Sequence, residues 1–287
     1  MGILTGGKEM KKINVKKLQI FILYIALSIG AFLMIFPFLW GIFTSFKTMS
    51  EIMHTPPTFW PKNPTLKNYN EVLKTIPIVQ YYLNSLLVTS ITTLSVLFTG
   101  SLTGYIFAKF EFLGKKVLFT LILASMMIPF AVTMVPLYIT LNFFGLIDSY
   151  GALIIPLLTT PFSIFLICQY IKGSITTEML EASRIDGCSE FGIYLRIIIP
   201  QIKPALAALA IFNFMSVWNL YIWPLVAVNS TELRTLPVGI AMLRGQYQTR
   251  WDLISAATVL AVVPALIMFF ILQKQFVEGI TLTGIKG

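Results

Sequence analysis

One short run near the start of the chain has the composition of a phosphate-binding loop. Residues 2–8 read GILTGGK, which places glycines and a lysine as such a loop requires. The next residue, Glu9, stands where a Ser or Thr hydroxyl would bind magnesium, and no strand pattern precedes the run. We therefore predict that the chain needs no cofactor of its own. ATP and magnesium, if they are involved, would be bound by a partner chain.

The residue types that usually form catalytic or metal sites are scarce. The chain has two cysteines, Cys168 and Cys188, and one histidine, His54. The cysteines are about 20 residues apart without a metal-ligand spacing, and the histidine lies in a proline-rich stretch. We predict no catalytic residue, no metal site and no disulfide.

Uncharged polar residues stand out within the apolar parts of the sequence. The candidates to line a path for a hydroxylated solute are Asn84, Asn213, Trp218, Asn219 and Tyr221. The alternative is that they hydrogen-bond between helices as packing contacts. The apolar stretches contain no Asp, Glu, Lys, Arg or His, which argues against a carrier that couples through buried carboxylates.

A polar stretch, TTEMLEASRIDGCSEFGIYLRIIIP from Thr176, has the signals of two short helices. A threonine can cap the first helix, and Gly187 can end it in the left-handed conformation. Ser189 can cap the second helix, which we expect to run to Ile199 and to be broken by Pro200. Small residues near the turn would let another surface approach, although an ordinary connector would look similar.

These groups are set in a chain that is too apolar for one soluble core. Of its 287 residues, 56% are hydrophobic and 11% are charged, whereas a soluble domain carries about 25% charged residues. A spanning helix needs about 20 apolar residues. We predict an all-α, polytopic membrane protein with a tail at 1–17 and one transmembrane domain at 18–287. Its six transmembrane helices are expected at about 18–42, 82–108, 117–140, 150–171, 205–228 and 253–273, with a loop at 172–203.

The positive charges favour one orientation of these spans. The net charge is +9, and 14 of the 21 Lys and Arg residues fall on the side that holds both termini. Because Lys and Arg collect on the cytoplasmic side, we predict that both termini are cytoplasmic. The first apolar stretch is too long for a cleaved signal peptide and is expected to be a retained span. No basic patch with interleaved aromatics indicates nucleic-acid binding.

The polar loop resembles the coupling-loop signature of permease subunits in binding-protein-dependent ABC importers. That signature is Glu-Ala-Ala, two residues, Asp-Gly-Ala, then an aromatic residue and Leu-Pro. The matching positions are Glu181, Ala182, Asp186, Gly187 and Pro200. Ser183 and Cys188 stand where Ala is usual, and Ile199 where Leu is usual. The runs NPTLKNY, YYLNSLLVT, TLPVGI and FVEGITLTGIKG resemble the carbohydrate-uptake branch, so the resemblance covers nearly the whole chain.

The resemblance implies a type I ABC importer permease fold in the plasma (inner) membrane of a prokaryote. It implies four kinds of partner, namely a second homologous permease subunit, an ATPase subunit dimer, an extracytoplasmic solute-binding protein and membrane lipid. It assigns ATPase coupling to Glu181, Ala182, Ser183, Asp186, Gly187 and Pro200. It places the following residues in a loop that faces the solute-binding protein: Thr235, Leu236, Pro237, Gly239, Gly245 and Tyr247.

The function implied is import of a sugar or sugar-like solute by alternating access, driven by a separate ATPase subunit. In such a complex the solute path lies between the two permeases, so this chain would supply about half of it. One alternative is a stand-alone secondary carrier or channel for a small polar solute, in which the loop would have no docking role. Another is a membrane-embedded enzyme, for which no catalytic constellation appears. Co-purification with an ATPase separates the first function from the others.

Overall fold

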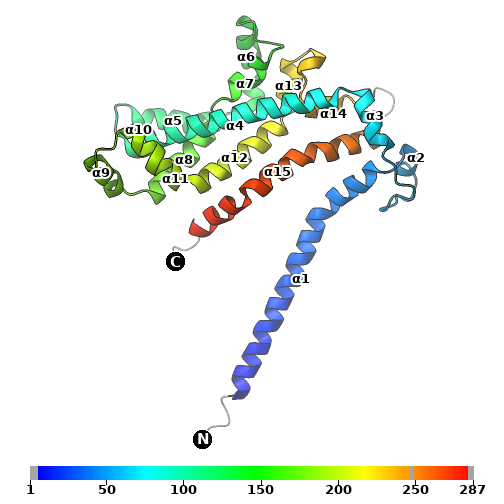
Figure 1. The fold of residues 1–287 in the computed structure, drawn as a ribbon, viewed down its shortest axis with the longest axis horizontal. Helices are drawn as coiled ribbons and strands as arrows, with labels where there is room; N and C mark the ends of the chain where they lie inside the picture. Colours follow the sequence, from blue (N-terminus) through cyan, green and yellow to red (C-terminus); the bar gives the residue numbers. More distant parts are fainter. Residues whose placement is uncertain (1–5, 246–248, 284–287) are drawn as a thin grey trace. The chain divides into compact units, whose positions relative to one another are not determined.

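The computed structural model describes residues 6–245 and 249–283, and it is nearly all-helical, as predicted (Figure 1). The described residues fall into two compact units. One contains residues up to 72 together with 249–259, and the other contains residues 73–245 together with 260–283.

The first unit is built around the end of the long helix α1. Its helices are α1 (Gly6–Ser45), α2 (Met49–Ile52), most of α3 (Lys67–Thr75) and the first turns of α15 (Trp251–Thr283). The side-chain amide of Asn68 in α3 donates to the carbonyl oxygens of Ser45 and Lys47, at 2.8 and 2.7 Å. Because those carbonyls follow the last turn of α1, Asn68 satisfies groups that the helix leaves unpaired.

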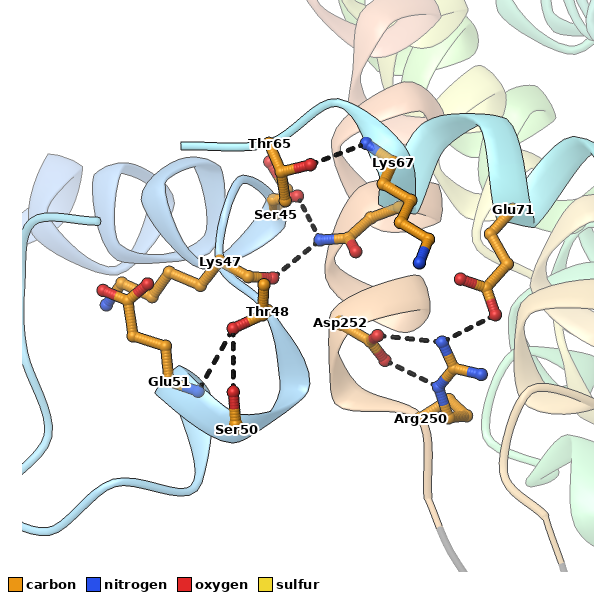
Figure 2. A network of polar contacts seen from close by, with 11 residues as sticks. Ser45, Lys47, Thr48, Ser50, Glu51, Thr65, Lys67, Glu71, Arg250 and Asp252 are labelled. Carbon is orange, nitrogen blue, oxygen red and sulfur yellow. Dashed lines mark hydrogen bonds and ion pairs between the residues drawn. The ribbon is translucent and has the colours of Figure 1, made fainter. Parts of the chain in front are cut away.

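An ion-pair cluster joins α3 to the start of α15 within the same unit (Figure 2). Arg250 donates through Nε and Nη2 to the two carboxylate oxygens of Asp252, at 3.0 and 2.9 Å. The Nη2 atom also lies 2.9 Å from Oε1 of Glu71. The Asp252 side chain is only 5% exposed, so its charge depends on this bidentate contact.

The second unit contains most of the apolar helices. They are α4 (Ile78–Lys109), α5 (Lys115–Ser125), α6 (Phe130–Phe143), α7 (Tyr150–Ile154), η1 (Ile155–Leu157), α8 (Pro161–Ser174), α9 (Thr177–Ile185), α10 (Glu190–Ile193), the π-helical turn η2 (Tyr194–Ile198), α11 (Ile199–Gln201), α12 (Lys203–Trp218), α13 (Ile222–Ala227), η3 (Thr231–Leu233), α14 (Leu236–Ala241) and the rest of α15.

Helix α4 packs most extensively against α8. Gly100 and Gly104 lie one turn apart on α4. A Cβ atom on Gly100 would lie 2.6 Å from Ser163 Cβ, and a Cβ atom on Gly104 would lie 2.9 Å from Ile167 Cβ. Small residues at this spacing let membrane helices approach closely. The run GSLTG at 100–104 carries this spacing, but we did not predict the contact from it.

Four described helices are long and apolar enough to cross a membrane, and up to six spans result if each of two bent pairs is one span. The predicted span 117–140 is broken between α5 and α6, which meet at 102°. Pro129 precedes α6 and disfavours the helical conformation in the residue before it. The predicted span 205–228 also divides, because α12 ends at Trp218 and α13 begins at Ile222.

Candidate functional site

The loop at 172–203, called the coupling loop below, folds as two short helical segments joined at Gly187. Gly187 has φ of +81°, and its N–H donates to the carbonyl of Arg184 at 3.0 Å. The N–H of Cys188 donates to the carbonyl of Ser183, also at 3.0 Å. These two bonds form a Schellman motif, which confirms the predicted left-handed end of α9. The hydroxyl of Ser189 accepts from the N–H of Gly192 at 3.2 Å, so the predicted second cap is confirmed as well.

The expected break at Pro200 is wrong. The second segment passes through Pro200 to Gln201, and the direction changes by 77° between Gln201 and Lys203. In a regular α-helix the proline ring would clash with the carbonyl of Arg196. Here the preceding turn is π-helical, and this wider turn accommodates the ring without ending the helix.

Most of the proposed coupling residues lie at the surface of the loop. The exposed ones are Glu181, Ala182, Asp186, Gly187 and Pro200. Ser183 differs, because it is 8% exposed and its hydroxyl donates to the carbonyl of Met179 at 2.7 Å. Ser183 therefore packs inside the loop, where its small side chain fits a buried position.

Within the loop as the structure describes it, Arg184, Glu190 and Glu178 make polar contacts, whereas Glu181 does not. Arg184 Nε lies 2.7 Å from Oε1 of Glu190, and this hydrogen bond raises the pKa of the Arg184 guanidinium. The pKa of Glu178, in the first turn of α9, is lowered first by a backbone N–H and then by the Thr176 hydroxyl. Glu181 forms no hydrogen bond or ion pair with any residue that the structure describes, so its carboxylate is available to another chain.

Arg184, Glu190 and Tyr105 also belong to this site, although their sequence positions did not predict it. Glu190 accepts from Arg184 and, at 3.2 Å, from the hydroxyl of Tyr105 on α4. A six-residue separation across a turn is not a helical spacing, and Tyr105 is 85 residues away, so no local pattern shows the contact.

The TLPVGI segment (residues 235–240), predicted to face a solute-binding protein, is partly buried within the chain. It forms most of α14 and packs on α4, so that Thr235, Leu236 and Gly239 are buried. The N–H of Leu236 donates to Ser85 Oγ at 2.8 Å, and a Cβ on Gly239 would lie 2.0 Å from Tyr81 Cδ2.

These buried residues therefore cannot present side chains to a partner. Of the other residues assigned to this loop, Pro237 is partly exposed and Gly245 is exposed. Tyr247 lies outside the described residues.

The proposed path residues separate into two groups, and the first group makes internal packing contacts. Asn84 is 2% exposed, and its Nδ2 donates to the carbonyls of Glu232 and Arg234, at 2.7 and 2.9 Å. Its Oδ1 accepts from the Tyr150 hydroxyl at 2.7 Å. Trp218 is also buried, and its Nε1 donates to the carbonyl of Ala261 at 3.0 Å.

The second group belongs to α12 and the residues that follow it, and its members differ in exposure, since Asn213 is only 8% exposed. Asn219 is exposed and Tyr221 is partly exposed. Asn213 donates to Thr93 Oγ1 at 3.1 Å and also borders an open hollow. The hollow is lined by Thr160, Phe162, Leu209, Phe212, Asn213 and Ser216. A lining that combines uncharged polar and aromatic side chains suits a hydroxylated solute. Asn84 and Trp218 do not line this hollow, and both are hydrogen-bonded within the chain.

Comparison with known proteins identifies the family of the chain. The chain matches the family described as binding-protein-dependent transport system inner membrane component over residues 100–281. It is 35% identical to the arabinooligosaccharides transport system permease protein AraQ of Halalkalibacterium halodurans, over 93% of this chain and 96% of the relative. It is 34% identical to AraQ of Bacillus subtilis, over 98% of this chain and 99% of the relative.

A solved structure shares the fold. The chain superposes on a chain from a bacterial ABC transporter involved in the import of alginate with a TM-score of 0.78. The match covers 91% of this chain and 98% of that chain, at 23% identity. From these matches together with the loop geometry, we conclude that the chain belongs to the family of binding-protein-dependent transport system inner membrane components.

Proposed function

We propose that this chain is a transmembrane permease subunit of an ATP-binding-cassette importer for a sugar or sugar-like solute. Its relatives over nearly the full length carry the name of an arabinooligosaccharide permease, which supports a carbohydrate substrate. The uncharged lining formed by Thr160, Asn213 and Ser216 also suits a neutral, hydroxylated solute.

The proposed topology has six spans, with α5–α6 as one broken span and α12 preceded by the coupling loop. The 14 Lys and Arg residues on the side of the termini support a cytoplasmic location for both ends. A membrane-impermeant reagent should label cysteines placed at Lys115 and Ser189 only from the cytoplasm. Cysteines at Lys62 and Arg244 should be labelled only from outside. Labelling of position 189 from outside would rule out this topology.

One observation carries the coupling proposal, namely the exposed turn at Gly187 at the end of α9, the helix on which the exposed Glu181 also lies. A left-handed glycine with nothing within 4 Å of its would-be Cβ lets a partner surface come close. We place this turn in a groove of the ATPase subunit, which binds ATP and magnesium. A second permease and a solute-binding protein complete the importer.

The experiment compares Gly187→Trp and Glu181→Lys in the co-expressed importer. We expect both variants to insert normally into the membrane and to lose uptake of labelled oligosaccharides, tested with arabinotriose, lactose and maltotriose. The ATPase should either be released in detergent or hydrolyse ATP without transport. The matched controls are Gly145→Trp, at another left-handed glycine with open space around it, and Glu232→Lys, at an exposed carboxylate beside the TLPVGI segment. Wild-type uptake with the ATPase bound in both loop variants would reduce the loop to a connector.

A further inference from the structure

The carboxylate of Glu190 connects three helices of the second unit at one point. It accepts from Arg184 of α9 through Nε at 2.7 Å and Nη2 at 3.4 Å, and from the Tyr105 hydroxyl of α4 at 3.2 Å. Glu190 itself begins α10. A two-pronged guanidinium contact fixes orientation as well as distance. The two halves of the coupling loop are thereby held to each other and to α4.

Further contacts reinforce the connection to α4 on both sides of Glu190. The hydroxyls of Ser101 and Tyr194 lie 2.7 Å apart, and the rings of Tyr105 and Tyr194 stack with centroids 6.1 Å apart. Lys109 Nζ donates to the carbonyl of Ile175 at 2.5 Å, just before α9 begins. The loop is therefore attached to the last turns of α4 before, at and after the Gly187 turn.

The helix that leads into the loop is held to α4 as well. Helix α8 runs into α9 through Ile175 and Thr176, and its Ser163 and Ile167 pack onto Gly100 and Gly104 of α4. Contact this close leaves no room for α4 to slide along α8. A displacement of the loop must then move α4 and α8 together, and Glu190 is the side chain that ties both α9 and α10 to α4.

We propose that Glu190 is a positioning residue that converts movement of the coupling loop into movement of α4, by holding Arg184 and Tyr105 at once. The proposal rests on the proposed function, because it assumes that an ATPase moves the loop. Glu190 itself need not touch the ATPase. The side chains of Arg184 and Glu190 are 39% and 46% exposed, and exposed ion pairs add little to folding stability. Loss of the contact should therefore spare the fold and affect coupling.

The experiment measures the amount of solute imported per ATP hydrolysed by the full importer in proteoliposomes, with the oligosaccharide that the wild type transports. In Glu190→Ala we expect the ATPase to remain bound and to hydrolyse ATP, while the ratio of solute to ATP falls by about tenfold. Tyr105→Phe removes only the α4 contact and should lower the ratio by less. The matched control is Glu111→Ala, which removes an ion pair of the same length, 2.7 Å to Lys115, that joins no separate helices of the loop.

A charge reversal separates positioning from mere structural support. Arg184→Glu alone should uncouple the importer, and Arg184→Glu combined with Glu190→Arg should recover part of the ratio, since the pair is restored in reverse. An unchanged ratio in Glu190→Ala, with wild-type transport intact, overturns the role of Glu190 and leaves the proposed function standing. A wild-type chain that neither retains an ATPase nor imports an oligosaccharide overturns both.

Discussion

The coupling loop and the TLPVGI segment lie at opposite ends of α4 and differ in what they expose (Figure 1). Both consist of short helical segments between apolar helices, and both were predicted from a sequence signature. The loop exposes most of its signature residues, whereas the segment buries Thr235, Leu236 and Gly239 against α4. A signature can therefore mark an exposed surface at one end of a helix and a packing contact at the other.

The largest effect is expected at Gly239, where the TLPVGI segment meets α4. In Gly239→Val the new side chain would overlap Tyr81, because even a Cβ would lie 2.0 Å from its ring. We expect destabilisation of about 3 kcal/mol or more, as for severe overpacking. The measurement is thermal unfolding of the purified chain in detergent. Gly173→Ala is the control, because nothing lies within 4 Å of that Cβ position. Equal melting temperatures for both variants would show that the segment is not packed on α4.

A smaller loss is expected at Asn84, which holds the same segment through hydrogen bonds. Asn84→Ala leaves the Arg234 carbonyl and the Tyr150 hydroxyl without their hydrogen bonds from and to Asn84, and the Glu232 carbonyl keeps only a 3.4 Å bond from Gln80. Lost hydrogen bonds of this kind cost about 2–3 kcal/mol together. Asn219→Ala removes an exposed amide that bonds only to the carbonyl one turn earlier, so stability should barely change.

Uptake kinetics of the same two variants test the assignment of the path. If Asn219 faces the solute, its variant should change the KM for uptake while the melting temperature stays constant. The assignment fails if Asn84→Ala changes KM at unchanged stability, because that would place Asn84 rather than Asn219 on the path.

Two neighbouring residues of the coupling loop should respond differently to the same change. Ser183→Leu places a large side chain in a buried site and should destabilise the chain by about 1–2 kcal/mol. Ala182→Leu enlarges an exposed surface, so the fold should be unaffected while the ATPase no longer binds. Melting temperature and ATPase pull-down should thus separate the two variants, and loss of stability in Ala182→Leu would contradict the exposed placement.

The smallest effect is expected at Asp148, which lies between α6 and α7. Its pKa is lowered, chiefly by the hydrogen bond from the Ser230 hydroxyl and then by the backbone N–H groups of Ser230 and Asn229. A carboxyl whose pKa is lower when folded adds stability above its unfolded pKa, near 4. That contribution is lost as the pH falls through the folded pKa. Melting temperatures should fall in acid slightly more steeply for the wild type than for Asp148→Asn, and parallel curves would contradict this.

Local patterns sufficed for the features that depend on neighbouring residues. The helical class, the Gly187 turn and the Ser189 cap follow from apolar runs and from capping chemistry. The passage of the helix through Pro200 did not follow, because a π-helical turn has no simple sequence signal.

Contacts between distant parts of the chain could not be predicted in this way. Tyr105 meets Glu190, and Asn84 meets the backbone of Arg234, across 85 and 150 residues. The burial of Ser183 and Gly239 likewise depends on which helix packs over each of them. A small residue in a signature is compatible with a docking partner or with the chain's own core, and only the packing decides between them.

The unbroken helix α4 also has a mechanical consequence. Tyr105, beside the coupling loop, and Tyr81, beside the TLPVGI segment, are joined by continuous helix and are about 36 Å apart at 1.5 Å per residue. A helix of this length acts as a lever, so that a tilt of about 10° at one end displaces the other by about 6 Å. A small tilt that begins at the end beside the coupling loop would thus become a displacement of several ångströms at the end beside the TLPVGI segment.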